Sequence, residues 1–468
     1  MKHSKLEIQN SPFPRYDRYK DSGVEWLGEV PEHWEVRSLR GILKERGETN
    51  EGTKTDFILS VMKDRGVIPY TEKGNVGNKM SEDITTYKIV HPGDLVINKM
   101  NAIIGSLGIS EHHGALSKVY FVLQPRYEYL NNRFYGYLFR IRDFQKSLCK
   151  ISYGIMELRE SINFNEFKNL PLPLPPKPEQ DRIVAFLDRK TAEIDTLIAK
   201  KQRQIELLDE QKAILINRAV TRGLSGVASA KTGLNPNASS EASAKGDAKL
   251  KPSGIEWIGD IPQHWEVLKL RRLLSNIEQG NSPNAVQENG DPEQWKVITL
   301  SAVSKGEFRK DAFKPISSST VQKEANTLRP GDLLLTRANT RSLVGDACIV
   351  GQVLPNTTFS DLVYRFQTTV RISPNYLLRY LLANAARSQI ERDARGSNET
   401  MCKVSHGHIK EWDITLPPMA EQSAIVARLV DLDRYHTSAS ASIKSQIHAL
   451  QTLRSTLIAH AVTGSIKV

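Results

Sequence analysis

The sequence has few cysteines and no long apolar run. Its cysteines, Cys149, Cys348 and Cys402, form no CxxC pair, so their spacing indicates neither a zinc site nor a disulfide framework. Sparse thiols fit a reducing compartment. Residues 1–10 are polar and lack the apolar centre of a signal peptide. No run of about 18 apolar residues occurs, so we expect no membrane contact and a cytoplasmic protein.

The sequence also lacks complete catalytic motifs. It has no Asn-Pro-Pro-aromatic methyltransferase motif. Residues 47–55 imitate a phosphate-binding loop, but Thr53 stands where lysine is required. The Glu-x-Lys triplets at 166–168 and 210–212 imitate nucleases; the first has no Pro-Asp partner and the second falls inside an expected helix. The pair at 406 and 408, His-Gly-His, has no further metal ligands at a standard spacing. We therefore expect no catalytic residues, no metal and no cofactor in this chain.

Positive charge is in excess. Lys and Arg number 64 against 53 Asp and Glu, a formal net charge of +11. The excess lies mostly outside two long helices that the sequence predicts, in the segments before them. A basic surface on globular domains suggests an anionic partner, with nucleic acid the first candidate.

Two long helices are predicted, over 177–223 and 417–464. Pro178 suits the first turn of a helix, and Gly223 and Gly464 suit the position just after one. Apolar residues recur in a narrow stripe typical of a coiled coil. Two such stripes in one chain most simply bury each other in an antiparallel pair. The stripe comprises Ile183, Leu187, Ile194, Leu197, Ile198, Ile205, Leu208 and Leu215 in the first helix, and Ile425, Leu429, Leu432, Ile443, Ile447, Leu450 and Leu457 in the second.

The chain contains an internal repeat. Residues 22–36 read SGVEWLGEVPEHWEV, and residues 253–267 read SGIEWIGDIPQHWEV. Pro-Gly-Asp-Leu occurs at 92–95 and 330–333, and Glu-Gln-x-x-Ile-Val opens both predicted helices. We interpret the repeated tryptophans and prolines as structural. Between the repeats, 224–250 is rich in small and polar residues and is expected to be a flexible linker.

Each repeat mixes strands and helices, so the fold class is α/β (α+β) with an internal pseudo-twofold repeat. We expect a helix at 36–46, a buried strand after each Pro-Gly-Asp turn, one helix at 130–150 or 374–392, then a polar loop and a closing strand. The predicted organisation is a domain at 1–176, a helix at 177–223, the linker, a domain at 251–416 and a helix at 417–464.

These repeated motifs, in the same order twice, resemble the specificity subunit of type I restriction–modification systems. The resemblance covers nearly the whole chain. It implies two similar target recognition domains, each reading one half of a bipartite, asymmetric sequence in double-stranded DNA. It further implies that the two long helices form an antiparallel coiled coil that sets the spacing of the half-sites.

The resemblance also implies partners. The long helices would dock two methyltransferase (modification) subunits, which bind S-adenosylmethionine and methylate adenine. Restriction subunits, which use ATP and Mg, would join the full complex. The predicted helix–helix or partner interface comprises Ile183, Leu187, Ile194, Leu208, Leu215, Ile425, Leu429, Ile443, Leu450 and Leu457.

Candidates for DNA contact are polar side chains on loops that follow the strands, because Arg and Lys can bond guanine and Asn can bond adenine. For each of them, a phosphate contact or a solvated loop position is the alternative. The candidates in the first repeat are Lys99, Asn101, Tyr153 and Arg159, and those in the second are Arg337, Asn339, Arg341, Asn398, Lys403 and His406.

Two other functions stay open. One is a stand-alone DNA-modifying enzyme, a nuclease or adenine methyltransferase with duplicated recognition domains, which would bind S-adenosylmethionine or cut DNA by itself. The other is a structural coiled-coil adaptor, which would show no salt-dependent binding to duplex DNA.

Overall fold

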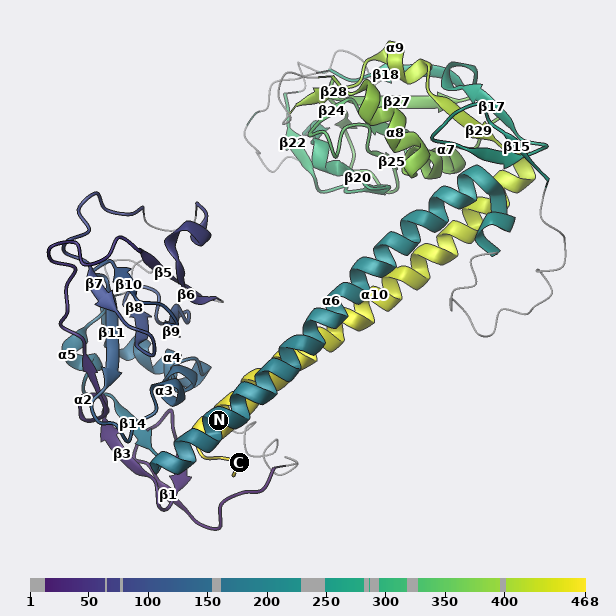
Figure 1. Ribbon diagram of the computed structural model, residues 1–468. Coiled ribbons are helices and arrows are strands. Elements are labelled where there is room, and N and C mark those ends of the chain that lie inside the picture. Colours follow the sequence, from purple (N-terminus) through teal and green to yellow (C-terminus); the bar gives the residue numbers. More distant parts are fainter. Residues whose placement is uncertain are drawn as a thin grey trace. The chain divides into compact units, whose positions relative to one another are not determined.

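The computed structural model describes residues 13–63, 65–75, 79–153, 161–228, 249–281, 286, 294–317, 327–395 and 401–468. The chain forms two compact units of mixed helix and strand (Figure 1). Unit 1 comprises Met1–Gln202 and Lys444–Val468, and unit 2 comprises Arg203–Ile443. Each unit therefore combines one globular repeat with parts of both long helices.

The two units are built on the same four-stranded antiparallel sheet. In unit 1 the strand order is β4 (Leu43–Glu45), β11 (Tyr120–Pro125), β8 (Leu95–Asn98) and β9 (Leu107–Ile109). In unit 2 the order is β18 (Leu274–Gln279), β27 (Val363–Thr368), β23 (Leu333–Thr336) and β25 (Ala347–Ile349). The buried strands expected after Pro-Gly-Asp are β8 and β23, so that prediction is confirmed.

Smaller strand groups surround each sheet. Those of unit 1 are β1 (Tyr19–Asp21) with β2 (Glu29–Pro31), β3 (Glu35–Ser38) with β14 (Pro171–Leu174), β5 (Leu59–Met62) with β6 (Gly66–Pro69), β7 (Lys88–Val90) with β10 (Gly114–Leu116), and β12 (Ser152–Tyr153) with β13 (Ser161–Ile162). Those of unit 2 are β15 (Leu250–Pro252) with β16 (Asp260–Pro262), β17 (Glu266–Lys269) with β29 (Asp413–Leu416), β20 (Val303–Ser304) with β21 (Glu307–Phe308), β24 (Ala338–Asn339) with β28 (Cys402–Lys403), and β22 (Phe313–Pro315), β19 (Lys296–Ile298) and β26 (Thr357–Thr358) together.

Two predicted helices are each broken in two. In place of 130–150 there are α3 (Asn132–Leu138) and α4 (Arg142–Leu148), and in place of 374–392 there are α7 (Pro374–Leu381) and α8 (Asn384–Asp393). The backbone is extended at Ile141 and at Ala383, so the second helix of each pair can turn back over the sheet. The apolar pattern continues through both breaks because both helices bury a face in the same core.

The helix predicted over 36–46 is wrong. That stretch is β3, the single turn α2 (Leu39–Ile42) and β4. Pairing of β3 with β14, from Glu35 opposite Leu174 to Ser38 opposite Pro171, overrides the local helix preference. The remaining short helices are α5 (Phe164–Phe167), α9 (His406–Lys410) and the 3₁₀ turns η1 (Tyr70–Lys73), η2 (Cys149–Ile151), η4 (Leu270–Arg272) and η5 (Leu300–Ala302).

The long helices are α6 (Lys177–Ala228) and α10 (Met419–Val462). In unit 1 Arg454 Nε lies 2.9 Å from Asp195 Oδ1, and in unit 2 Lys212 Nζ lies 2.8 Å from Asp433 Oδ1. Early α6 thus meets late α10, and late α6 meets early α10, so the two helices run in opposite directions within each unit. Among the described residues, no helix contains a segment that is both long and apolar enough to cross a membrane.

Buried residues recur along each long helix in steps of three and four residues, and together they form the seam between the two helices. Most stripe residues are buried, namely Ile183, Leu187, Ile194, Ile205, Leu215, Ile425, Leu429, Ile443 and Leu457. Leu208 and Leu450 are half-buried. Leu197 was expected in the stripe, but 46% of it is exposed, because it falls one position short of the half-buried Ile198.

Each long helix has a glycine with a left-handed backbone near its carboxyl end: Gly223 kinks α6, and Gly464 follows α10. Gly223 has φ of 73° and Gly464 has φ of 74°. A Cβ on Gly223 would approach Trp265, and a Cβ on Gly464 would approach Trp34. The predicted end at Gly464 thus lies just past α10, whereas α6 is kinked at Gly223 and continues to Ala228; both tryptophans are fully buried. Most of the expected linker, residues 229–248, lies outside the described part of the chain.

The repeated Glu-Gln pair fastens each long helix to its globular repeat. Gln180 Oε1 accepts a hydrogen bond from the backbone N–H of Asn131, and Gln422 Oε1 accepts one from Ser373, both at 2.8 Å. Each glutamine also donates to a proline carbonyl in the turn before its helix, Pro175 at 2.8 Å and Pro417 at 2.9 Å. The motif recurs because the same buried backbone groups need a partner in both units.

Candidate nucleic-acid interface

The segment after the Pro-Gly-Asp strand lies beside the later loop in both units. In unit 1 the backbone N–H of Ile162 donates to the carbonyl of Lys99 at 3.0 Å. In unit 2 the N–H of Val404 donates to the carbonyl of Arg337 at 3.0 Å, and β24 pairs with β28. Two stretches that are far apart in sequence therefore meet at the same place in each unit, and most candidate DNA contacts lie on them.

In unit 1 two of the candidates, Lys99 and Asn101, lie on a tight turn. Asn98 Oδ1 accepts the N–H of Met100 at 3.0 Å, and the Asn98 carbonyl accepts the N–H of Asn101 at 3.1 Å. This turn leaves Lys99 half-buried and Asn101 exposed. Tyr153 lies on β12, which pairs with β13. Arg159 is outside the described residues.

In unit 2 the structure holds Arg337 more firmly. Its backbone N–H donates to the Leu362 carbonyl at 2.8 Å, and Nη1 donates to the Asp361 carbonyl at 3.4 Å. Asn339, on β24, is half-buried, and its Oδ1 accepts the N–H of Thr340 at 2.8 Å.

The other candidates of unit 2 are mostly exposed. Lys403 is exposed on β28, opposite Ala338, and His406 is exposed at the start of α9. Arg341 is exposed on the turn after β24. Asn398 lies outside the described residues.

Sequence reasoning missed Tyr364. This residue of β27 is only 3% exposed, and its ring lies 5.9 Å from that of His406 at an interplanar angle of 29°. Burial raises the pKa of Tyr364, while a hydrogen bond and charge from the Arg337 side chain act in the opposite direction. The first repeat also has an aromatic residue, Phe121, at this point of its sheet, but a shared aromatic residue on a buried strand does not by itself indicate a contact with Arg337.

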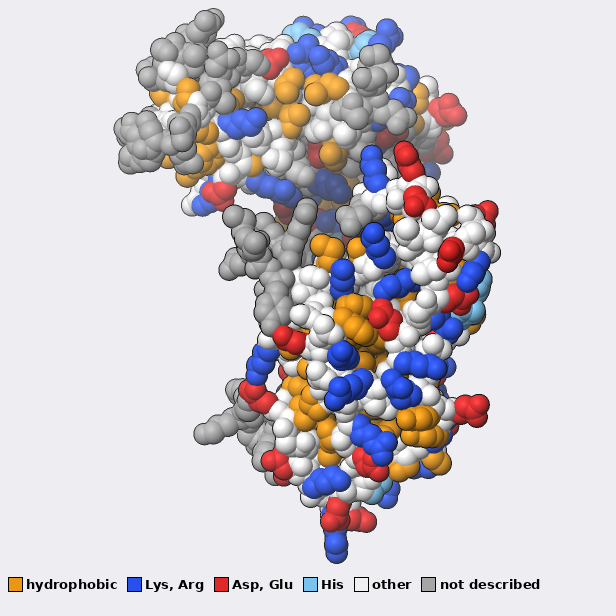
Figure 2. All heavy atoms as spheres, turned by 90° about the vertical axis from the view of Figure 1, so that its left-hand side faces the viewer, with side chains coloured by type: hydrophobic (Ala, Val, Ile, Leu, Met, Phe, Trp, Pro, Cys, Tyr) orange, Lys and Arg blue, Asp and Glu red, His pale blue; other side chains and the backbone are white. Residues whose placement is uncertain are grey.

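Lys and Arg side chains gather on the face of unit 1 turned toward the viewer in Figure 2. Charge pairs neutralise some basic residues in this unit. Lys88 Nζ lies 2.7 Å from Glu45 Oε1, and Arg46 Nε lies 2.7 Å from Asp94 Oδ2. The basic excess is thus carried by side chains without such pairs, which can meet an anionic ligand.

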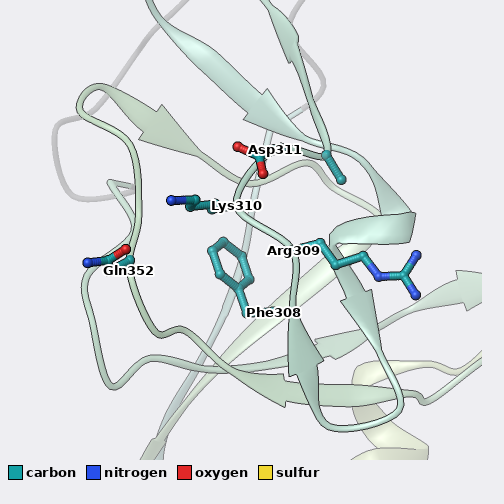
Figure 3. Close-up of a pocket in the computed structure, with 6 residues that line it drawn as sticks. Phe308, Arg309, Lys310, Asp311 and Gln352 are labelled. Atoms are coloured by element: carbon teal, nitrogen blue, oxygen red, sulfur yellow. The ribbon is translucent and has the colours of Figure 1, made fainter. Parts of the chain in front are cut away.

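A surface hollow of about 550 Å³ lies in unit 2 after β21. Figure 3 shows Phe308, Arg309, Lys310, Asp311 and Gln352 around it. The lining has a single carboxylate and no Ser, Cys or His nucleophile or base. Across the described residues, no group of three or more His, Cys, Asp or Glu side chains is arranged to hold a metal ion, and this includes His406 and His408.

The chain is similar to proteins of one family. Residues 31–207 match the model for the type I restriction modification DNA specificity domain. The chain is 23% identical over 417 residues to the type I restriction enzyme MjaVIII specificity subunit of Methanocaldococcus jannaschii, covering 86% of this chain and 87% of that one. It is 20% identical over 459 residues to the EcoKI specificity subunit of Escherichia coli K12, covering 94% and 90%.

The fold is also similar to a solved chain. That chain comes from a study of complex assembly and conformational transition of the type I R-M system, and the TM-score is 0.64 at 15% sequence identity. The similarity covers 92% of this chain and 98% of the other. Family model, relatives and fold agree in one respect: the chain is similar to the specificity subunits of type I restriction–modification systems, and residues 31–207 match a DNA specificity domain.

Proposed function

We propose that the two units read the two halves of a bipartite, asymmetric sequence in double-stranded DNA. The observation that carries this proposal is the shared arrangement at Lys99–Ile162 and Arg337–Val404, with the same backbone hydrogen bond and different side chains. The two units share a backbone scaffold but carry different polar side chains, Lys99 and Arg337, at the same position. This suits two different half-sites, because base edges are distinguished by their donors and acceptors.

The long helices would set the distance between the half-sites. Support comes from their opposite directions in each unit and from the seam of buried apolar residues. The length of an α-helix is fixed by its residue count and its regular rise, so a paired stretch of this kind can act as a spacer. The unread gap in the DNA target would then depend on helix length.

The chain would work only within a complex. Exposed apolar residues on the long helices, including Leu207, Ile214 and Leu453, offer surface for two methyltransferase subunits. S-adenosylmethionine would be bound by those subunits, and ATP and Mg by restriction subunits. The assembly would act on DNA in the cytoplasm.

Mapping methylated motifs tests this function. Cells that carry the chain with its methyltransferase partners should methylate adenine within a two-part motif, and Arg337→Ala should alter one part only. Loss of both parts together, with normal assembly, would contradict separate half-site reading. The rival enzyme hypothesis predicts that the chain alone binds S-adenosylmethionine or cuts DNA, which isothermal titration and a plasmid cleavage assay can detect.

A further inference from the structure

The two units differ in chemistry at the same point of their sheets. In unit 2 the aromatic pair beside Arg337 is Tyr364 with His406. In unit 1 the corresponding pair is Phe121 with Phe164, whose ring centroids are 5.0 Å apart. The correspondence follows from strand register. Tyr364 pairs with Leu335 of β23, and Phe121 pairs with Ile97 of β8. Leu335 and Ile97 are both the last-but-one residue of their strand.

This difference determines what can hold the long basic side chain. Phenylalanine offers no hydrogen-bonding group, so nothing on the aromatic pair of unit 1 can fix the direction of Lys99. Tyr364 contributes a hydroxyl that hydrogen-bonds the Arg337 side chain. Burial and the nearby charge of Lys410 lower the pKa of His406, so its ring is mainly neutral at pH 7 and does not repel the guanidinium.

Arg337 is anchored on several sides and still has an unused donor. Its backbone bonds Leu362 and Val404, Nη1 reaches the Asp361 carbonyl, and the side chain contacts Tyr364. Within the described part of the chain, Nε is shielded from solvent and has no hydrogen-bond partner. A buried donor without a partner costs free energy, and an incoming acceptor would remove that cost.

We propose that Arg337 is a guanine-reading residue of unit 2 and that Tyr364 and His406 are positioning residues that hold its guanidinium toward the DNA. The inference rests on the proposed function and deepens it by naming a base and the group that reads it. A planar guanidinium held in one orientation can form paired hydrogen bonds to O6 and N7 of guanine in the major groove. Lysine, as in unit 1, is a point charge without that geometry.

The test uses the full chain assembled with its methyltransferase partners and a duplex that contains the mapped target. Each guanine of the unit 2 half-site is replaced in turn by 7-deazaguanine, which lacks the N7 acceptor. With the parent chain, one replacement should weaken binding by about 5- to 150-fold, the range for a bidentate contact to a base. With Arg337→Ala the duplex that carries that replacement and the normal duplex should bind equally.

Two further variants separate reading from folding. Tyr364→Phe keeps the packing and should reduce the penalty of the 7-deazaguanine duplex while the melting temperature stays unchanged. Arg271→Ala removes an exposed arginine of the same unit that pairs with Glu411, and should keep the full penalty.

Each outcome has a defined meaning. A target whose unit 2 half-site contains no guanine, or an Arg337→Ala complex that stays as sensitive to 7-deazaguanine as the parent, would overturn the inference while half-site reading stands. A parent complex that binds no specific duplex would overturn the proposed function itself.

Discussion

The imidazole of His264 lies 2.8 Å, Nε2 to Oε2, from the carboxylate of Glu421. The first repeat has the same relationship, with His33 Nε2 2.8 Å from Glu179 Oε2. The His-Trp pair at the start of each repeat and the Glu-Gln pair at its end are therefore in contact. This explains why two motifs at opposite ends of the repeat recur together.

Replacing Glu421 should destabilise unit 2. Glu421 Oε2 also accepts the indole N–H of Trp265 at 3.0 Å, and that indole is fully buried. Glu421→Ala would leave the N–H without a partner, at a cost of about 1–3 kcal/mol. Chemical denaturation of the full chain measures the loss. Glu421→Gln keeps an acceptor and should lose clearly less; equal losses for both variants would argue against the hydrogen bond.

Gly223→Ala should be more destabilising than an ordinary glycine substitution. A Cβ there would lie 2.9 Å from Glu421 Oε1 and 3.2 Å from Trp265, and the positive φ is unfavourable for alanine. We expect a loss of roughly 1–3 kcal/mol in the free energy of unfolding. A Cβ added to Gly351 in the same unit would have no atom within 4 Å, so Gly351 is the matched control. Thermal melts in which Gly223→Ala and Gly351→Ala behave alike would refute the close approach.

Asp433 should make stability depend on pH in acid. Burial alone would raise the pKa of Asp433, but Lys212 and Arg379, at 2.8 and 2.6 Å, outweigh burial and lower it. A lowered pKa means that the contribution is present above the ordinary aspartate value, about 3.9, and is lost as pH falls through the folded-state value.

Asp433→Asn should therefore reduce the free energy of unfolding at pH 7 by about 1–2 kcal/mol, between the values for exposed and buried pairs. The difference from the parent should shrink as pH falls below about 4 toward the lowered folded-state pKa, where the parent carboxylate also becomes neutral. Asp431→Asn, which removes an exposed pair with Arg434, is the control and should change little. A difference that stays constant from pH 7 to pH 3 would count against the charge contribution.

Inserting one heptad into both long helices should widen the unread gap. The insertions would follow Gln202 in α6 and Ile443 in α10, where the chain passes between units. A heptad keeps the seam in register and adds roughly 10 Å, the length of about three base pairs. Motif mapping in cells measures the gap. An insertion in one helix alone should disturb pairing and reduce methylation; an unchanged gap with both insertions would refute the spacer.

Local patterns predicted the repeated elements well. Pro-Gly-Asp marks a turn in both units because Gly93 and Gly331 have positive φ, and because Asp94 and Asp332 accept backbone N–H groups three residues earlier. These interactions lie within a few residues of sequence, so the pattern alone specifies them.

Long-range pairing was the part that local patterns missed. The stretch at 36–46 became strand because of β14, which lies at the far end of the repeat. The helix seam also contains polar positions, such as His436, whose ring lies 2.7 Å from Asp209. An apolar stripe cannot reveal these positions, because their partners belong to the other helix.

The same limit applies to the candidate interface. The meeting of the Lys99 and Arg337 turns with the later loops could be expected from the repeat, because both segments were polar and irregular in both copies. Tyr364 could not be expected, because an aromatic residue on a buried strand is normally a core residue. Its role depends on a contact with Arg337 that only the folded chain brings about.

Unit 1 buries Ala461, Val462 and Ile466 beside Trp34 and Phe134, in one core. A ribosome therefore produces nearly all of unit 1 long before the segment that completes its interior. During synthesis the core of the first repeat stays incomplete until residues 444–468 are made, which happens only after all of unit 2 has been synthesised. Unit 2 escapes this delay, because Ala219 and Val220, which fill the same position in its core, are made before its globular repeat.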